Sequence, residues 1–144
     1  MYKKILVPLD GSPLAEAVLP HAEAIAKFEN GEIIILRVID MPITEFLARD
    51  PLVADMIHKD AEKESEKYVH DKVAALEREH IKVNGMAKEG SVPDTILEVA
   101  EQTHADVIAM STHGRTGMQR WLMGSVADKV VSHAHIPVML IHPN

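Results

Sequence analysis

Residues 107–128 read VIAMSTHGRTGMQRWLMGSVAD, and the order of residue types in this stretch decides the fold. It begins with four apolar residues, a run typical of a parallel strand that is buried on both faces. A polar loop of small residues follows, and the pattern after Gly124 predicts a helix with Val126, Val130 and Val131 on one face. A strand, a glycine-bearing loop and a helix start can bind phosphate. Glycine lets backbone N–H groups approach an anion closely, and the first turn of a helix attracts negative charge.

The same loop also fits a purely structural role. Residues 125–128 match the S-x-x-D capping box, in which Ser125 would serve only as the N-cap of the helix. At the level of the loop alone, phosphate binding and helix capping both remain open.

The rest of the chain repeats the alternation of strand and helix. Strands are predicted at 4–9, 32–39, 80–87, 107–110 and 136–141, and a helix follows each of the first four. Ser12 and Pro13 open the first helix, and Pro20 predicts a kink or an early break in it. The second helix is long and charged, over about 52–79. Its expected buried side consists of Val53, Met56, Ile57, Tyr68, Val69, Val73 and Leu76.

This order of elements predicts a single α/β domain over 1–144, built on a five-stranded parallel sheet with helices on both faces. Right-handed crossovers and the usual doubly wound solution give the strand order 3-2-1-4-5. The winding then reverses between the first and fourth strands, and open α/β sheets bind ligands at that switch point. The loops at 8–12 and 110–117 should therefore face one crevice, which is the place that the loop chemistry also indicates.

Composition narrows the possible classes of protein. The chain has 144 residues, 47% of them hydrophobic, and a formal net charge of −7. Such an acidic chain with few aromatic residues is a poor candidate for nucleic-acid binding. It has no cysteine, no apolar run long enough to span a membrane, and no signal-peptide pattern after MYKK. We expect a cytoplasmic protein that binds neither nucleic acid nor membrane.

Four separated segments resemble the universal stress protein family. They are KKILVPLDGS at 3–12, RVID at 37–40, GSVPDTI at 90–96 and STHGRTGMQRWLMGSVADKVVSHAHIPVMLI at 111–141. The resemblance covers nearly the whole chain and is weakest over residues 41–80. It implies the Rossmann-like fold of the adenine nucleotide alpha hydrolases.

The ATP-binding branch of that family carries the motif G-x2-G-x9-G-[ST]. Gly114, Gly124 and Ser125 match it here, whereas Ser111 stands at the first glycine position, where close backbone approach is less favourable. The resemblance implies a nucleotide site, with ATP held together with Mg²⁺, at Pro8, Asp10, Val38, Met110, Ser111, Gly114, Gly124, Ser125 and Val126. It also implies a homodimer paired through the last strand, 136–142.

The remaining polar residues of the loop are weighed by their chemistry. Arg115 could offset phosphate charge, since arginine donates paired hydrogen bonds, or could be a plain surface cation. His113 could contact phosphate, but it has no identifiable nucleophile or fixed carboxylate partner nearby in sequence, so no catalytic residue is assigned. The spacing of His133, His135 and His142 matches no zinc pattern, and no metal site is expected.

Three functions fit these observations. The first is a regulatory stress-response protein that binds ATP, hydrolyses it little or not at all, and is read by a protein partner. The second is a dimeric interaction module of the same family that no longer binds nucleotide, which Ser111 would favour. The third is an enzyme, either an ATPase or a transferase that acts on an adenylated substrate. ATP hydrolysis would be slow, because the sequence shows neither Mg²⁺ anchoring nor a residue to position water.

Overall fold

Helices and strands alternate along the computed structural model, which describes residues 1–40, 48–114 and 123–143. The elements in chain order are β1 Lys4–Leu9, α1 Pro13–Glu16, α2 Leu19–Glu29, β2 Glu32–Ile39, α4 Pro51–Glu77, β3 Lys82–Glu89, α5 Val92–Gln102, β4 Val107–Ser111, α6 Ser125–His133 and β5 Val138–Ile141. The predicted bounds of β1 and β2 are confirmed. The third strand lies about two residues later than predicted, and β5 begins only after Pro137.

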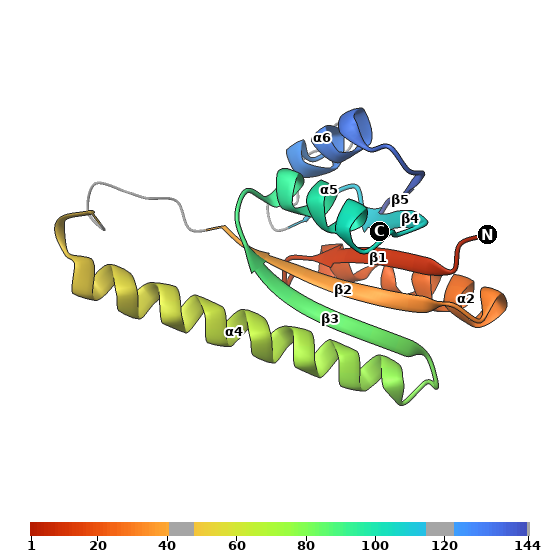
Figure 1. Ribbon diagram of the computed structural model, residues 1–144, viewed down its shortest axis with the longest axis horizontal. Coiled ribbons are helices and arrows are strands. Elements are labelled where there is room, and N and C mark those ends of the chain that lie inside the picture. The colour runs from red at the N-terminus through yellow and green to blue at the C-terminus, as the bar shows by residue number, and fades with distance from the viewer. Residues whose placement is uncertain (41–47, 115–122, 144) are drawn as a thin grey trace.

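The strands form one parallel sheet in the order β3-β2-β1-β4-β5, which confirms the predicted topology (Figure 1). Val7 of β1 lies beside Ile35 of β2, and Ile5 lies beside Val107 of β4. The chain therefore winds outward from β1 to β3 and then returns to the other side of β1. The switch point lies between β1 and β4, where the carboxyl ends of both strands meet a crevice.

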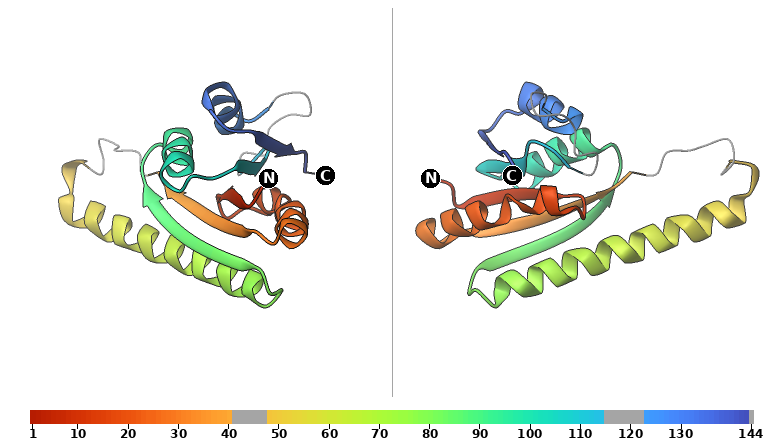
Figure 2. Two further views of the ribbon diagram at one scale, coloured as in Figure 1. Left: turned by 45° about the vertical axis from the view of Figure 1, so that its right-hand side comes forward. Right: turned by 180° about the vertical axis from the view of Figure 1, so that it is seen from behind.

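Two hydrophobic cores cover the two faces of the sheet. Because side chains alternate along a strand, neighbouring residues of β2 enter different cores. Ile33 and Ile35 pack against α1, α2 and α4, whereas Ile34 and Leu36 pack against α5 and α6. Figure 2 shows the same layers from two further directions, with α2 and α4 on one side and α5 and α6 on the other. Among the described helices, none combines the length and apolar character needed to cross a bilayer.

The predicted break near Pro20 is confirmed. Helix α1 ends at Glu16 and α2 begins at Leu19, so that the proline occupies the first turn of α2, where its missing N–H costs nothing. At the start of α1, Ser12 Oγ accepts a hydrogen bond of 3.2 Å from the N–H of Ala15, as expected of an N-cap.

The predicted buried side of the long helix is wrong in its first part. Met56 and Ile57 are 65% and 40% exposed, whereas Val69 and Leu76 are buried as predicted. With its 27 residues α4 is about 40 Å long, but an eight-residue strand spans only about 26 Å. The beginning of α4 therefore extends past the sheet (Figure 1) and has no core to pack against.

This difference along α4 predicts unequal effects of alanine substitution. Val69→Ala should lower the free energy of unfolding by about 1–3 kcal/mol, because it removes buried methyl groups and leaves a cavity. Met56→Ala should change it by less than about 0.5 kcal/mol. Chemical denaturation of both variants would check this, and a larger loss for Met56→Ala would mean that the first turns of α4 are covered in solution.

Candidate functional site

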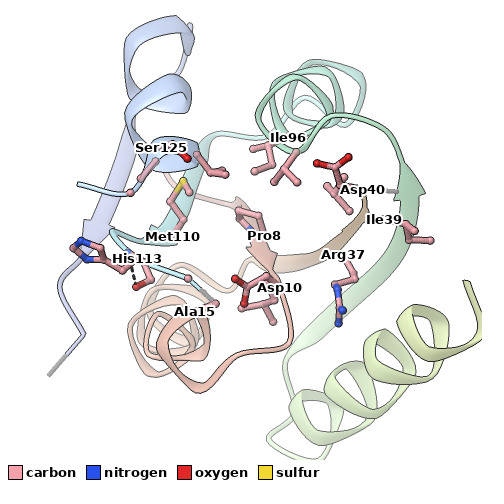
Figure 3. Close-up of a pocket in the computed structure, with 18 of the residues that line it drawn as sticks. Pro8, Asp10, Ala15, Arg37, Ile39, Asp40, Ile96, Met110, His113 and Ser125 are labelled. Atoms are coloured by element: carbon pink, nitrogen blue, oxygen red, sulfur yellow. Dashed lines mark hydrogen bonds between the residues drawn. The ribbon is translucent and has the colours of Figure 1, made fainter. Parts of the chain in front are cut away.

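A cavity of about 440 Å³ opens over the carboxyl ends of the strands at the switch point (Figure 3). Its walls come from the loop after β1, the ends of β2 and β4, the first turns of α5 and α6, and the middle of α4. The position is the one that doubly wound folds use for ligands.

The cavity brings together nine of the residues predicted for the nucleotide site. These are Pro8, Asp10, Val38, Met110, Ser111, Gly114, Gly124, Ser125 and Val126. Arg115, the tenth, lies outside the described residues, as do Trp121 and Leu122 of the same loop. The structure thus places the nine residues around one space, and their contacts with a nucleotide remain a prediction.

The loop after β4 is held at both ends by its own backbone. The N–H of Gly124 donates to the carbonyl of Thr112 at 2.8 Å, which joins the start of α6 to the end of β4. Thr112 is 1% exposed, so this junction is fixed inside the protein. A Cβ built on Gly124 would lie only 2.9 Å from the Thr112 carbonyl oxygen, and only glycine fits this close approach.

The start of α6 differs from the capping-box alternative. Gly124 is the N-cap, and Ser125 is the first residue of the helix, with its side chain exposed to solvent. Because the N-cap is a glycine, no cap side chain among the described residues accepts a hydrogen bond from the first turn of α6. Its N–H groups therefore suit an anion from outside the helix, as the phosphate interpretation of the loop requires.

Asp10 shapes the turn after β1 and also contacts the loop after β4. Its Oδ1 accepts hydrogen bonds from the N–H and the Oγ of Ser12, at 2.9 and 2.6 Å, which shapes the turn after β1. Its Oδ2 lies against Gly114, so close that a Cβ there would collide with it. The carboxylate therefore joins the loop after β1 to the loop after β4.

Ser111 keeps its side chain inside the loop. The residue is buried, and its Oγ accepts a hydrogen bond of 3.4 Å from the N–H of His113. The Nδ1 of His113 in turn lies 3.0 Å from Thr112 Oγ1. The loop accommodates serine at the first motif position because the serine hydroxyl forms a hydrogen bond within the loop.

Sequence reasoning missed the polar pair Arg37 and Glu64 on the α4 side of the cavity. Val92 and Ile96 line the opposite, apolar side, and Asp40 lies near Ile96 (Figure 3). The only available signal was a lone arginine within the apolar strand EIIILRVI. Its partner Glu64 lies 27 residues further along the chain, and no local pattern connects the two.

Behind Arg37, Tyr68 links α4 to α1. Its hydroxyl donates to Glu16 Oε2 at 2.7 Å, and Lys72 Nζ donates to the other oxygen of Glu16. Burial, with the Glu16 carboxylate as the next cause, raises the pKa of the Tyr68 hydroxyl far above its ordinary value. The hydroxyl therefore remains a hydrogen-bond donor at any physiological pH.

One group of possible metal-ligating side chains occurs among the described residues, away from the cavity. Donor atoms of His58, Glu62 and Glu89 lie within 4.8 Å of one another, and His58 Nε2 lies 2.7 Å from Glu89 Oε2. The hydrogen bond between His58 and Glu89 is sufficient to explain why these side chains lie together, without a metal ion. His133, His135 and His142 are exposed.

The contact with Glu89 predicts the titration of His58. The hydrogen bond stabilises the protonated imidazole and raises the pKa of His58 above its ordinary value of 6.5. Because the folded pKa is raised, the contribution to stability is complete below pH 6.5 and is lost as the pH rises through the folded pKa. NMR titration should show this pKa, and Glu89→Gln should move it back toward 6.5. An unchanged titration in that variant would contradict the contact.

The sheet order and the cavity over its carboxyl edge define a doubly wound, Rossmann-like α/β protein with a site at the switch point. A model of the universal stress protein family matches residues 1–142. The chain belongs to that family.

Individual members of the family align with nearly the whole chain. Universal stress protein MJ0531 of Methanocaldococcus jannaschii is 34% identical over 144 aligned residues, which cover 98% of this chain and 82% of that protein. Universal stress protein MJ0577 of the same organism is 31% identical, over 98% of this chain and 95% of that protein. The solved structure of MJ0577 matches with a TM-score of 0.89 at 30% identity, covering 100% of this chain and 98% of that chain. Universal stress protein UspA from Lactobacillus plantarum matches with a TM-score of 0.81 at 26% identity, covering 97% of each chain.

Proposed function

We propose that this protein binds an adenine nucleotide, ATP in the first place, in the cavity at the switch point. The observation that carries the proposal is the meeting of Gly114, Gly124 and the start of α6, which has no side-chain cap among the described residues, around one space. These groups offer backbone N–H donors to phosphate without a side chain in the way. If the proposal is right, the protein belongs to the ATP-binding branch of the universal stress protein family.

The other walls suit the nucleoside. Val38, Met110 and Val126 belong to the apolar side of the cavity, next to the core under α5 and α6, and can pack against a purine ring. Asp10 stands at the end of β1, where a carboxylate can accept a hydrogen bond from a ribose hydroxyl. Arg115 would add positive charge at the phosphates.

Two structurally similar proteins support a nucleotide ligand. One is a universal stress protein in complex with cAMP, with a TM-score of 0.66 at 20% identity. The other is a universal stress family protein from Arabidopsis thaliana with AMP bound, with a TM-score of 0.65 at 19% identity. At these identities they support the fold and the kind of ligand, and the choice of ATP rests on the glycine loop.

Magnesium would enter with the nucleotide. In the part of the chain that the structure describes, no group of three metal-ligating side chains lies at the cavity. Mg²⁺ would therefore be held mostly by the phosphates, as is common for this ion. The same lack of anchoring, within the described residues, favours slow hydrolysis or none, and the slow ATPase is the weaker alternative.

In this proposal the nucleotide acts as a regulatory signal in the cytoplasm. ATP would stabilise one arrangement of the loop or of a homodimer paired through residues 136–142, and a protein partner would recognise that arrangement in a stress response. The unit would be the domain formed by residues 1–144.

The second candidate is a dimeric interaction module without nucleotide. Ser111 at the first motif position favours it. The hydrogen bond that Ser111 Oγ accepts from the N–H of His113 weighs against this second candidate. The serine side chain is used within the loop and does not fill the cavity where a nucleotide would bind.

Denaturing the purified protein and identifying the released small molecules by mass spectrometry would test the proposal, with calorimetric titration of ATP and Mg²⁺ beside it. Release of an adenine nucleotide, or micromolar binding of ATP, is the expected result. No released nucleotide and no heat of binding up to millimolar ATP would overturn the proposal in favour of the interaction module.

A further inference from the structure

Arg37 places a buried positive charge beside the cavity. The residue is 4% exposed, and its side chain lies on the α4 face of the sheet (Figure 3). Its Nη2 donates to Glu64 Oε2 at 3.2 Å, and the guanidinium lies over the Tyr68 ring, 5.0 Å from the ring centre. Arg37 therefore contacts α4 on one side.

The other side of the guanidinium lacks a hydrogen bond. Nη1 is buried and has no partner among the described residues. A buried donor without an acceptor costs stability, the more so when it carries charge, so such groups are rare in folded proteins. Because Arg37 lines the cavity, an acceptor on a bound ligand would supply the missing bond.

The position of Arg37 indicates which part of a nucleotide that acceptor belongs to. The glycine loop follows β4, Arg37 stands on β2, and β1 lies between them, so the two sites are about 10 Å apart. That separation places Arg37 away from the phosphates. It lies instead next to the loop after β1: a Cβ built on Gly11 would be 2.9 Å from Nη1, and Asp10 is the adjoining residue.

We propose that Arg37 contacts the ribose hydroxyls together with Asp10 and makes the site selective for ribonucleotides. The inference rests on the proposed nucleotide function and extends it to the sugar. A hydroxyl group both donates and accepts, so it matches a carboxylate that accepts beside an arginine that donates. A deoxynucleotide would leave the charged donor without an acceptor, which strongly disfavours it.

Contact with the ligand requires a small rearrangement, because Gly11 covers Nη1. Gly11 has φ of +89°, and glycine changes its backbone dihedral angles more readily than other residues, so the turn after β1 can adjust at this position. Glu64 is 61% exposed on its side chain, and an exposed partner holds the guanidinium only weakly. A rotation of Arg37 toward the sugar would thus also alter its contact with α4.

Calorimetric titration of ATP, 2′-deoxyATP and 3′-deoxyATP tests the proposal. The wild-type protein should bind at least one deoxy analogue about tenfold more weakly than ATP. Arg37→Met should bind ATP about tenfold more weakly and lose the discrimination at that hydroxyl, and Arg37→Lys should retain part of it. Lys63→Met, which removes an exposed cation from α4, is the matched control and should behave like the wild type.

The outcomes separate the two proposals. A wild-type protein that binds ATP but does not discriminate against either deoxy analogue overturns the role of Arg37, whether or not the variants fold. Unchanged discrimination in a folded Arg37→Met variant overturns it as well. If the wild-type protein binds none of the three nucleotides, the proposed nucleotide function itself fails.

Discussion

Gly114→Val should weaken ATP binding at least 100-fold while the protein remains folded. A Cβ at this position would press against the Asp10 carboxylate, and the two further methyl groups of valine would occupy the space between the two loops. The obstructing neighbour is a side chain, so it can turn aside in the free protein at the cost of its hydrogen bonds with Ser12 and without moving the backbone of the strands. Calorimetry would measure the affinity for ATP, and thermal unfolding followed by circular dichroism would report on the fold.

The control for Gly114→Val is Ser132→Ala, on an exposed position of α6 outside the cavity. It should leave the affinity for ATP within about twofold of the wild type. Gly114→Val with wild-type affinity would rule out phosphate binding at this loop and would leave the cavity without its proposed ligand.

Substitution of Gly124 should have a different effect from substitution of Gly114, although both glycines belong to the same motif. Its added Cβ would meet the carbonyl oxygen of Thr112, part of a buried backbone that cannot turn aside. Gly124→Val should therefore lower the free energy of unfolding as well as the affinity for ATP. For this reason Gly114 is the sharper test of the site.

The parts of the fold that follow from local patterns could be predicted from the sequence. Continuous apolar runs identify β1 and β2, because strands buried on both faces must be apolar throughout. The alternation of strands and helices, together with the handedness of crossovers, leads to the observed strand order. The strand order then brings Asp10 and Gly114 to the same edge of the sheet.

The features that depend on three-dimensional distance could not be predicted. Periodicity identifies an apolar face on α4 but cannot tell where the helix leaves the sheet, so Met56 and Ile57 were wrongly placed in the core. The surroundings of Arg37 include Glu64 and Tyr68, which become its neighbours only when α4 crosses the end of β2. The helix after Gly124 was predicted, but the capping-box alternative placed its N-cap at Ser125, one residue late, because serine and glycine both serve as N-caps.

The proposed pairing of two copies through β5 leads to the second large effect, which is predicted for Leu140→Pro. The N–H of Ile108 donates to the carbonyl of Pro137, and that of Thr112 donates to the carbonyl of Ile141. Alternate residues of a parallel strand face its neighbour, so the backbone groups of Val138 and Leu140 point to the open edge. Proline at 140 removes one outward N–H from each protomer and leaves the contact with β4 in place.

The loss of two hydrogen bonds across a symmetric pair should cost about 2–4 kcal/mol, which weakens the dimer roughly 30- to 1,000-fold. Analytical ultracentrifugation should then find the wild-type protein as a dimer and Leu140→Pro largely as a monomer at the same concentration. Leu140→Val is the matched control, because it keeps both the N–H and an apolar side chain. An unaltered dimer mass for Leu140→Pro would place the interface elsewhere. A monomeric wild-type protein would instead mean that the half-buried edge of β5 needs no second copy to cover it.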